Sequence, residues 1–261
     1  MARAYASASS QYFEYNGAIT AEPFTFSCWA YVAATGVSAQ ALMSFGTSVT
    51  TAGRYILFAG GTSFTPNNSV AAQAVNAAGS GANAIAASTY SAATWFQAGI
   101  VFASSASRTA YFNGAGGTEE TTSITIDPNM DRAMLGTRMI TGTRGLFLNG
   151  RLAEAGMWNV ALTASEMASL GAGVSPLLIR PQSLVGYWPS FARATNEEPW
   201  AGANVFVPGA SSPTAIDHPP RIIYPSRPRI IIPGAAVGGT FVPIIGRGPG
   251  MALAAGRGLA A

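Results

Sequence analysis

The sequence predicts an all-β protein with one short helix and an extended C-terminal arm. Through the first two thirds of the chain, short segments of alternating apolar and polar residues are separated by Gly, Ser and Asn turns. One helix-start pattern follows the last of these segments, and the end of the chain is rich in Pro and Gly. We therefore expect a β-domain over residues 1–190, a linker over 191–218 and an extended assembly arm over 219–261.

The strand over Phe24–Val32 (FTFSCWAYV) has the clearest alternation. One of its faces carries Phe24, Phe26, Cys28, Ala30 and Val32, and the other carries Thr25, Ser27, Trp29 and Tyr31. Successive side chains of a strand point to opposite sides, so these two sets are the two faces of one strand. The other expected strands are 11–15, 41–46, 55–59, 95–102, 110–113, 123–126, 133–136 and 151–160.

The helix is expected over residues 163–170. Thr163 and Glu166 form a capping box, in which the threonine hydroxyl accepts from a first-turn amide while the glutamate reaches back. Met167 and Leu170 then fall on one helical face, and two glycines end the helix.

Several motifs together resemble one known family. Segment 145–190 contains Gly150, Leu152, Glu154 and Trp158 in a strand, followed by the capped helix, as in the closing segment of laminin G-like domains. The segments WFQAGIVFA, RTAYFNG and Met134-Leu135-Gly136 match earlier strands of the same pattern in the same order. The chain thus resembles the laminin G-like domains of the concanavalin A-like lectin/glucanase superfamily over about residues 5–190.

This resemblance implies an antiparallel β-sandwich of the jelly-roll type. Glu154 and Glu166 belong to the family pattern, in which we expect them to be structural hydrogen-bond partners. The positions that the resemblance assigns to the core or its support are Trp29, Trp95, Trp158 and Trp188. Trp200 lies outside the pattern and is a better candidate for an interface anchor.

Charge is scarce and unevenly distributed. Charged residues make up 10% of the chain, against roughly 25% in a typical soluble domain. Residues 55–107 carry no charge at all, which makes a poor surface for a free monomer. We therefore expect this region to be covered by neighbouring copies or another protein, in a homo-oligomer such as a trimer.

The C-terminal arm contains a short repeat, PRIIYP followed by PRIIIP. Apolar triplets bracketed by proline suit edge strands, so each is expected to pair along the edge of another chain. The expected partner-binding residues, besides Trp200, are Arg221, Ile222, Ile223, Arg227, Arg229, Ile230, Ile231 and Ile232. Because these arginines are spaced by Ile and Pro, a protein partner is favoured over nucleic acid.

The stretch Asp217-His218-Pro219-Pro220 resembles the end of laminin G-like proteins encoded by bacteriophages. This resemblance implies a virion structural protein, assembled in the host cytoplasm, and we expect a capsid decoration protein whose arm anchors it to the shell or to neighbouring copies. Its partners would be the major capsid protein or tail proteins. The alternative is a carbohydrate-binding receptor-recognition module on a tail or fibre, with a glycan as ligand.

No catalytic residues are expected. Glycosidases of this superfamily carry paired carboxylates on one strand, and no E-x-D-x-x-E strand occurs here. Glu119 and Glu120 lie in a Gly/Thr-rich turn, and His218, the one histidine, precedes two prolines in the expected linker, as a turn residue would. A glycan-active enzyme and a tightly bound cofactor are therefore both disfavoured.

Calcium is the one metal that the sequence suggests. Asp127, Asn129 and Asp131 bracket a turn and could supply oxygen ligands. The other reading, which we favour, is that Asp127-Pro128-Asn129 forms an Asx turn.

Cysteine and hydropathy point to a cytoplasmic fold without a membrane span. Cys28 is the single cysteine and cannot form an internal disulfide. The N-terminus has no apolar leader, and the apolar stretch 230–246 is interrupted by two prolines.

Overall fold

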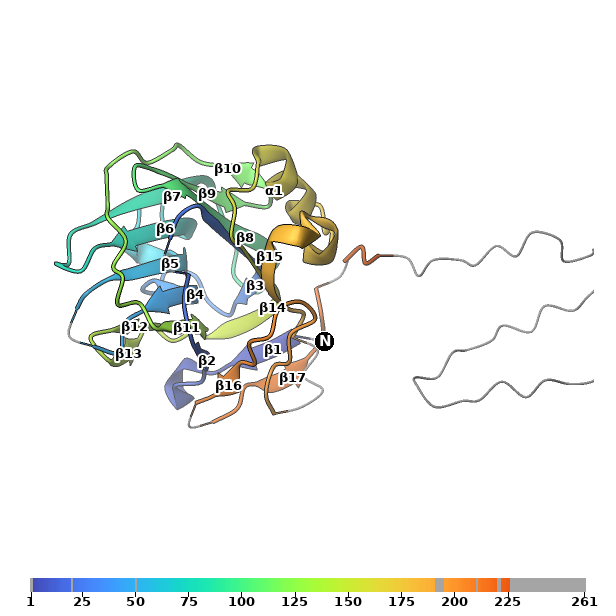
Figure 1. The fold of residues 1–261 in the computed structure, drawn as a ribbon. Coiled ribbons are helices and arrows are strands. Elements are labelled where there is room, and N and C mark those ends of the chain that lie inside the picture. Colours follow the sequence, from blue (N-terminus) through green and yellow to red (C-terminus); the bar gives the residue numbers. More distant parts are fainter. Residues whose placement is uncertain are drawn as a thin grey trace, which may run out of the picture. The chain divides into compact units, whose positions relative to one another are not determined.

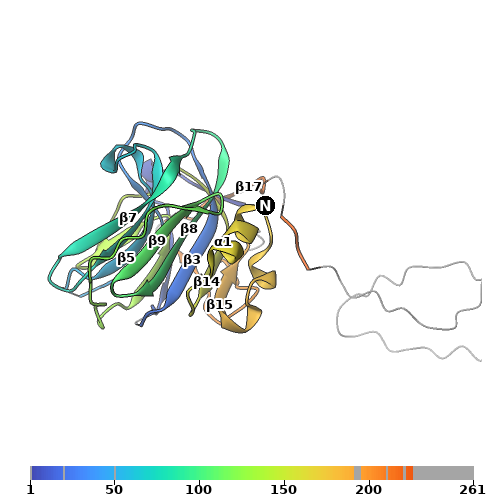
Figure 2. The ribbon, with the colours of Figure 1, turned by 90° about the horizontal axis from the view of Figure 1, so that it is seen from above.

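The computed structural model describes residues 2–225 except 20, 50, 191–194, 210, 220 and 221. These residues form two antiparallel sheets packed face to face, as Figures 1 and 2 show. The expected antiparallel β-sandwich is thereby confirmed. The expected partner-binding residues Arg221, Arg227, Arg229 and Ile230–Ile232 lie outside the described residues.

Sheet A has eight strands, and β15 pairs with β14 beside the main path. In spatial order its strands are β10 (Ala115–Gly116), β9 (Ser107–Phe112), β8 (Trp95–Ser104), β3 (Phe24–Val32), β14 (Gly150–Trp158), β1 (Ala2–Tyr5) and β17 (Thr214–Ile216), with β15 at Leu184–Trp188.

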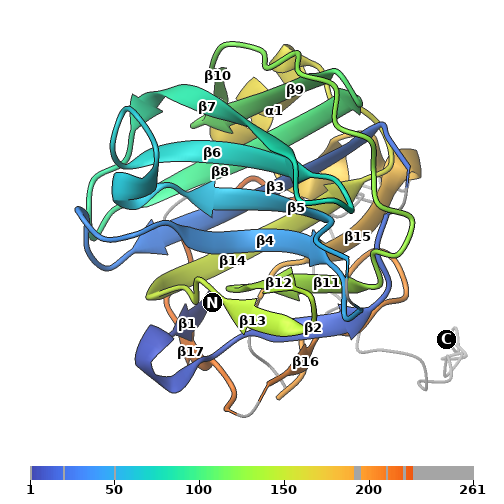
Figure 3. The same ribbon diagram turned by 90° about the vertical axis from the view of Figure 1, so that its left-hand side faces the viewer.

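Sheet B has seven strands. In spatial order they are β16 (Val207–Pro208), β2 (Phe13–Asn16), β11 (Arg132–Leu135), β4 (Gln40–Gly46), β5 (Arg54–Ala59), β6 (Ser69–Val75) and β7 (Gly81–Thr89). A separate hairpin of β12 (Arg138–Ile140) and β13 (Thr143–Gly145) lies in front of β4 and β11 on the outer face of this sheet, as Figure 3 shows.

The helices are short. The α-helix α1 spans Ala164–Gly171, and the 3₁₀ helices are η1 (Ser7–Ser9), η2 (Gly61–Ser63), η3 (Pro176–Leu178) and η4 (Pro181–Ser183). Among the described residues, no helix has the length and hydropathy needed to span a lipid bilayer.

The core fills the space between the inner faces of the two sheets. The two expected faces of β3 are present, and the structure places Phe24, Phe26, Cys28, Ala30 and Val32 in the main core cluster. Opposite it, sheet B contributes large side chains from β4 and β5, such as Phe45 and Tyr55. Alanines supply the inner faces of β6 and β7, which is why alternation there is hard to recognise in the sequence and neither strand was expected.

The capping box and the helix are confirmed. Thr163 accepts from the backbone N–H of Glu166, and the Glu166 carboxylate accepts from the N–H of Thr163. The helix packs on the outer face of sheet A, where Met167 lies against Gly99 of β8. A Cβ at Gly99 would approach Met167 Cε to 2.2 Å, so the glycine allows this close packing.

Two expectations about the chain's organisation need correction. Residues 123–126 form no strand, although Ile124 is buried. Part of the expected linker over 191–218 belongs to the sandwich, because β16 pairs with β2 and β17 pairs with β1. The physical reason is burial: Phe206 enters the core, and Glu197 forms a buried ion pair with Arg3 of β1.

Candidate functional site

Three adjoining hollows cross the outer face of sheet B. The central hollow is lined by Ala39, Arg54, Phe58, Ser63, Phe64, Gln73, Asn83, Arg138 and Leu146. It shares Ala39 and Leu146 with a second hollow beside Gln40, and Asn83 with a third beside Glu120. Their volumes are about 330, 340 and 330 Å³, so each is of the size that holds a small ligand.

Strand alternation places the side chains of the central hollow. In β5, Tyr55 and Leu57 point into the core, so Arg54 and Phe58 point outward. In β6 and β7, Gln73 and Asn83 stand between inward-facing alanines and also reach the outer face. Three neighbouring strands thus present polar side chains to one surface.

These polar side chains form a hydrogen-bonded ladder across the strands. Nε of Arg54 donates to Oε1 of Gln73 at 3.1 Å, and Nε2 of Gln73 donates to Oδ1 of Asn83 at 2.9 Å. Nη1 of Arg54 donates to the carbonyl of Ala52 at 2.8 Å. No hydrogen bond within the described residues uses Nη2 of Arg54 or Nδ2 of Asn83, so both donors are open to a ligand.

A second guanidinium enters the central hollow from the β12–β13 hairpin. Arg138 and Arg54 line the same space, and both side chains are about half buried. Burial, together with the nearby positive charge of Arg138, lowers the pKa of Arg54 to about 10. Burial also lowers the pKa of Arg138. Both groups stay charged at neutral pH, and neither forms an ion pair with a described carboxylate.

The floor of the central hollow is apolar. Phe58 and Phe64 lie with ring centroids 5.6 Å apart, and they pack on a small cluster with Ile56, Ala71 and Leu146. Phe64 comes from the loop after η2 and keeps part of its surface exposed. An aromatic surface beside amide and guanidinium donors is the combination that binds polyhydroxylated ligands.

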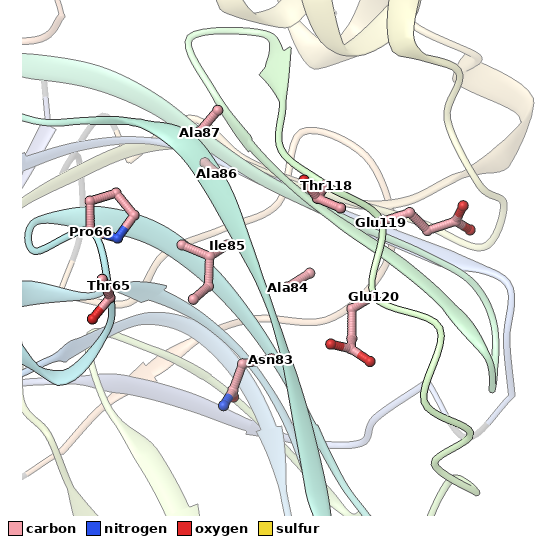
Figure 4. A pocket seen from close by; sticks show the side chains of 10 residues that line it. All are labelled: Thr65, Pro66, Asn83, Ala84, Ile85, Ala86, Ala87, Thr118, Glu119 and Glu120. Carbon is pink, nitrogen blue, oxygen red and sulfur yellow. The ribbon is translucent and has the colours of Figure 1, made fainter.

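The Glu120 hollow lies along the edge of β7, and Figure 4 shows its lining. One wall of this hollow is the segment that carries Thr118, Glu119 and Glu120. The segment can run close to β7 because the preceding residue, Gly117, has no side chain. A Cβ at Gly117 would lie 2.0 Å from the carbonyl oxygen of Ile85. In Figure 4 the two carboxylates point away from each other. Each is engaged, since Glu119 accepts from the Ser107 hydroxyl and Glu120 accepts from the Thr122 amide at 2.8 Å.

The expected calcium ligands serve the loops of the fold. Oδ1 of Asp127 accepts from the backbone and side-chain amides of Asn129, at 2.9 and 3.1 Å, so the Asx turn is present. Asp131 accepts from both the amide and the hydroxyl of Ser48 and from Arg132. Although Oδ2 of Asp127 is buried without a hydrogen-bond partner, the set does not fit calcium, because Asp131 is already neutralised by a guanidinium.

A buried carboxylate cluster connects the C-terminal segment to sheet A. The Glu154 side chain is 1% exposed. It accepts from the Tyr187 hydroxyl at 2.6 Å and from the Tyr224 hydroxyl at 2.7 Å, and it lies 2.7 Å from Nε2 of His218. Glu154 has φ of +54° at a bulge of β14, an uncommon conformation that turns its side chain toward this cluster. The prediction that Glu154 is a structural hydrogen-bond partner is confirmed. His218, which we expected to be a turn residue, also contacts the buried Glu154 carboxylate.

Two of the expected partner-binding residues contact their own chain. Ile223 forms a parallel bridge with Val174: its N–H donates to the Gly173 carbonyl at 2.7 Å and its carbonyl accepts from the Ser175 amide at 2.9 Å. Ile222 precedes this bridge. The first proline-bracketed triplet therefore adds along an edge of its own chain, where we expected another chain. The side chains of Ile223 and Trp200 are about half exposed, and Trp200 packs on Tyr187 and Tyr224.

Sequence reasoning did not find the central hollow. Arg54 stands directly before an expected strand, and the alternation of that strand could have placed it on the outer face. Nothing in the sequence brings Arg138 to the same surface, because the β12–β13 hairpin reaches sheet B only through long-range packing.

The chain matches the model of one known family. The family model for the concanavalin A-like lectin/glucanases superfamily matches residues 6–168. The chain belongs to this superfamily. The suggested phage origin finds no support in these comparisons, and no curated protein matches the sequence.

Several solved structures resemble the chain in fold. A candidate carbohydrate-binding protein from Bacteroides ovatus has 18% identity and a TM-score of 0.60, and the match covers 85% of this chain and 61% of that protein. A sialidase carbohydrate-binding module from Ruminococcus gnavus, bound to α2,3-sialyllactose, has 14% identity and a TM-score of 0.48, covering 58% and 84% of the two chains. A heptameric pentraxin from Limulus polyphemus has 11% identity and a TM-score of 0.48, covering 62% and 75%.

Proposed function

We propose that this protein is a carbohydrate-binding module whose ligand lies across the outer face of sheet B. The observation that carries the proposal is the ladder of Arg54, Gln73 and Asn83 beside the aromatic floor of Phe58 and Phe64. Sugar hydroxyls can accept from the open Arg54 and Asn83 donors, and the apolar face of a sugar ring can pack on the exposed part of Phe64.

The arrangement of the hollows favours an oligosaccharide over a single sugar. The central hollow adjoins the Gln40 hollow at Ala39 and Leu146, and the Glu120 hollow at Asn83. A ligand of several units could therefore follow the groove from one hollow to the next. Membership of a superfamily that includes lectins and glucanases agrees with this ligand class.

We further propose that binding is not accompanied by hydrolysis. Glycosidases need two carboxylates about 5–9.5 Å apart that flank the scissile bond. The carboxylates that line the three hollows are Glu119 and Glu120, which point apart and are each held by hydrogen bonds. Incubating the protein with any glycan that it binds should leave that glycan intact by mass spectrometry, and release of a shorter product would refute this proposal.

A glycan array probed with the purified protein tests the binding function. We expect Asn83→Ala to weaken binding about tenfold or less, the effect of losing one or two neutral hydrogen bonds. Asn159→Ala is the matched control, because Asn159 is an exposed asparagine just after β14 of sheet A and lines none of the three hollows. Absence of binding to every glycan, or equal losses in the two variants, would refute the proposed groove.

A second candidate function is assembly on a phage particle, as a decoration protein anchored by the C-terminal arm. It is favoured by the uncharged run over 55–107 and by the repeated PRII motif, which are features of the sequence. In this proposal the chain forms homo-oligomers and contacts capsid or tail proteins through residues 226–261. Truncation after Pro225 should then abolish attachment to particles, and retained attachment would refute the role of the arm.

A further inference from the structure

We infer that the glycan carries an anionic group, a carboxylate or a sulfate, that binds between Arg54 and Arg138. This inference rests on the proposed function, and it names the ligand class that the central hollow selects.

The starting observation is that these two arginines lack an acidic partner. Four other arginines form ion pairs with carboxylates, namely Arg3, Arg132, Arg144 and Arg180. Arg151 instead stacks over the Tyr31 ring, with its guanidinium carbon 4.2 Å from the ring centroid. Arg108 also forms no ion pair, but it is buried away from the central hollow and donates to the carbonyls of Ser105 and Thr122. Arg54 donates to neutral oxygens, and no hydrogen bond within the described residues uses the Arg138 guanidinium, although the Arg138 carbonyl accepts from the Thr137 hydroxyl.

Placing two guanidiniums side by side, half out of water, opposes folding. Desolvation and mutual repulsion both disfavour the charged forms, as the lowered pKa of Arg54 reflects. The hollow holds no carboxylate that would offset this cost. A locally unfavourable arrangement of this kind is typical of a ligand site, because the ligand supplies the missing partner.

An anion at this position would satisfy both groups. The Arg138 guanidinium can donate two parallel hydrogen bonds to a carboxylate or to a sulfate, and Nη2 of Arg54, whose Nε and Nη1 are already used, can add a further charge-assisted bond. Partial burial strengthens the interaction, because the local dielectric constant is lower than that of bulk water.

The neighbouring hollow limits where the anion can be. Glu119 and Glu120 give the Glu120 hollow a negative charge, and it meets the central hollow at Asn83. A sugar unit in that hollow should therefore be uncharged. The ligand is thus expected to be an oligosaccharide with one anionic unit next to neutral units, rather than a polyanion with a charge on every sugar.

The test compares lactose, sialyllactose and 3′-sulfolactose by isothermal titration calorimetry with the full chain. The two anionic probes share the neutral disaccharide and separate a carboxylate from a sulfate. We expect at least one of them to bind ten times more tightly than lactose, and tenfold corresponds to about 1.4 kcal/mol. A heparin-derived tetrasaccharide, which carries anionic groups on every unit, should bind more weakly than whichever of sialyllactose and 3′-sulfolactose binds more tightly.

Arg138→Gln should remove at least nine tenths of the preference for the anionic probe over lactose. Because the Arg138 guanidinium makes no hydrogen bond within the described residues, the variant should keep the circular dichroism spectrum and melt no lower than the parent. Arg138→Lys, which keeps the charge without the fork, should be intermediate. Arg151→Gln, on sheet A, is the control and should leave the preference intact.

The outcomes separate the two proposals. If lactose or another neutral glycan binds as tightly as every anionic probe, or if Arg138→Gln keeps the preference, the anionic inference is wrong and glycan binding stands. If no glycan binds at all, the proposed function fails and the inference fails with it. Tightest binding of the heparin fragment would overturn the expectation of a single anionic unit.

Discussion

Replacing Glu154 by alanine should strongly destabilise the sandwich. The Glu154 carboxylate is buried, and it holds hydroxyls of Tyr187 from β15 and Tyr224 from the C-terminal segment, with His218 beside them. Its removal would leave three polar groups without their acceptor. Tyr224 and His218 are partly exposed and can turn to water, but Tyr187 is fully buried and cannot.

The size of the effect follows from these contacts. A hydrogen bond to a charged group contributes about 1.5–3 kcal/mol, and the bond from the buried Tyr187 hydroxyl to Glu154 is lost. The one methylene that the change to alanine removes, Cγ, adds about 0.8 kcal/mol. The total is about 2–4 kcal/mol, which for a domain of this size corresponds to a fall in Tm of roughly 4–16 °C.

Urea denaturation and thermal melts followed by circular dichroism measure this loss. Glu154→Gln keeps the shape and one acceptor oxygen, so it should cost less than Glu154→Ala. Tyr224→Phe removes one partly exposed hydrogen bond and should cost about 1 kcal/mol. Glu198→Ala, at an exposed glutamate, should change stability by less than about 0.5 kcal/mol. A loss below about 1 kcal/mol for Glu154→Ala would refute the structural role of the cluster.

Three further predictions concern the chain end, the helix cap and the wall of the Glu120 hollow. Truncation after Asp217 should lower Tm because it removes two partners of the buried carboxylate, whereas truncation after Pro225 should not; equal melting of the two forms would contradict this. Burial alone would raise the pKa of Glu166, but hydrogen bonds from Thr163 and the ion pair with Arg180 lower it, so Glu166→Gln should cost about 1 kcal/mol at neutral pH. That difference should be lost as the pH falls through the lowered pKa of Glu166, because the parent then loses the same charge, and its persistence to about pH 2 would argue against these contacts. Gly117→Ala should lower the free energy of unfolding by about 1–3 kcal/mol, because its Cβ clashes with the β7 backbone. Gly145→Ala, with open space around it, should leave stability nearly unchanged, and similar Tm values for the two variants would show that the segment at Gly117 can shift to accept a Cβ.

Patterns of neighbouring residues were enough to predict the elements in which one face is much more apolar than the other. The alternation of Phe24–Val32 separated the two faces of β3, and the structure then places the Phe24 face in the core. The capping box at Thr163 and Glu166 gave the start of α1, because both partners lie within one turn of chain. Where the inner face consists of alanines, as in β6 and β7, the same reasoning found no strand.

The candidate site is a different case, because its groups come from distant parts of the sequence. The sequence by itself determined the superfamily pattern, the main strands, the helix and the scarcity of charge. Only the tertiary structure brought Arg138 beside Arg54, joined His218 and Tyr224 to Glu154, and built β16 and β17 into the two sheets. The physical reason is that alternation and capping act between near neighbours along the chain, whereas these contacts depend on how separate segments pack in space.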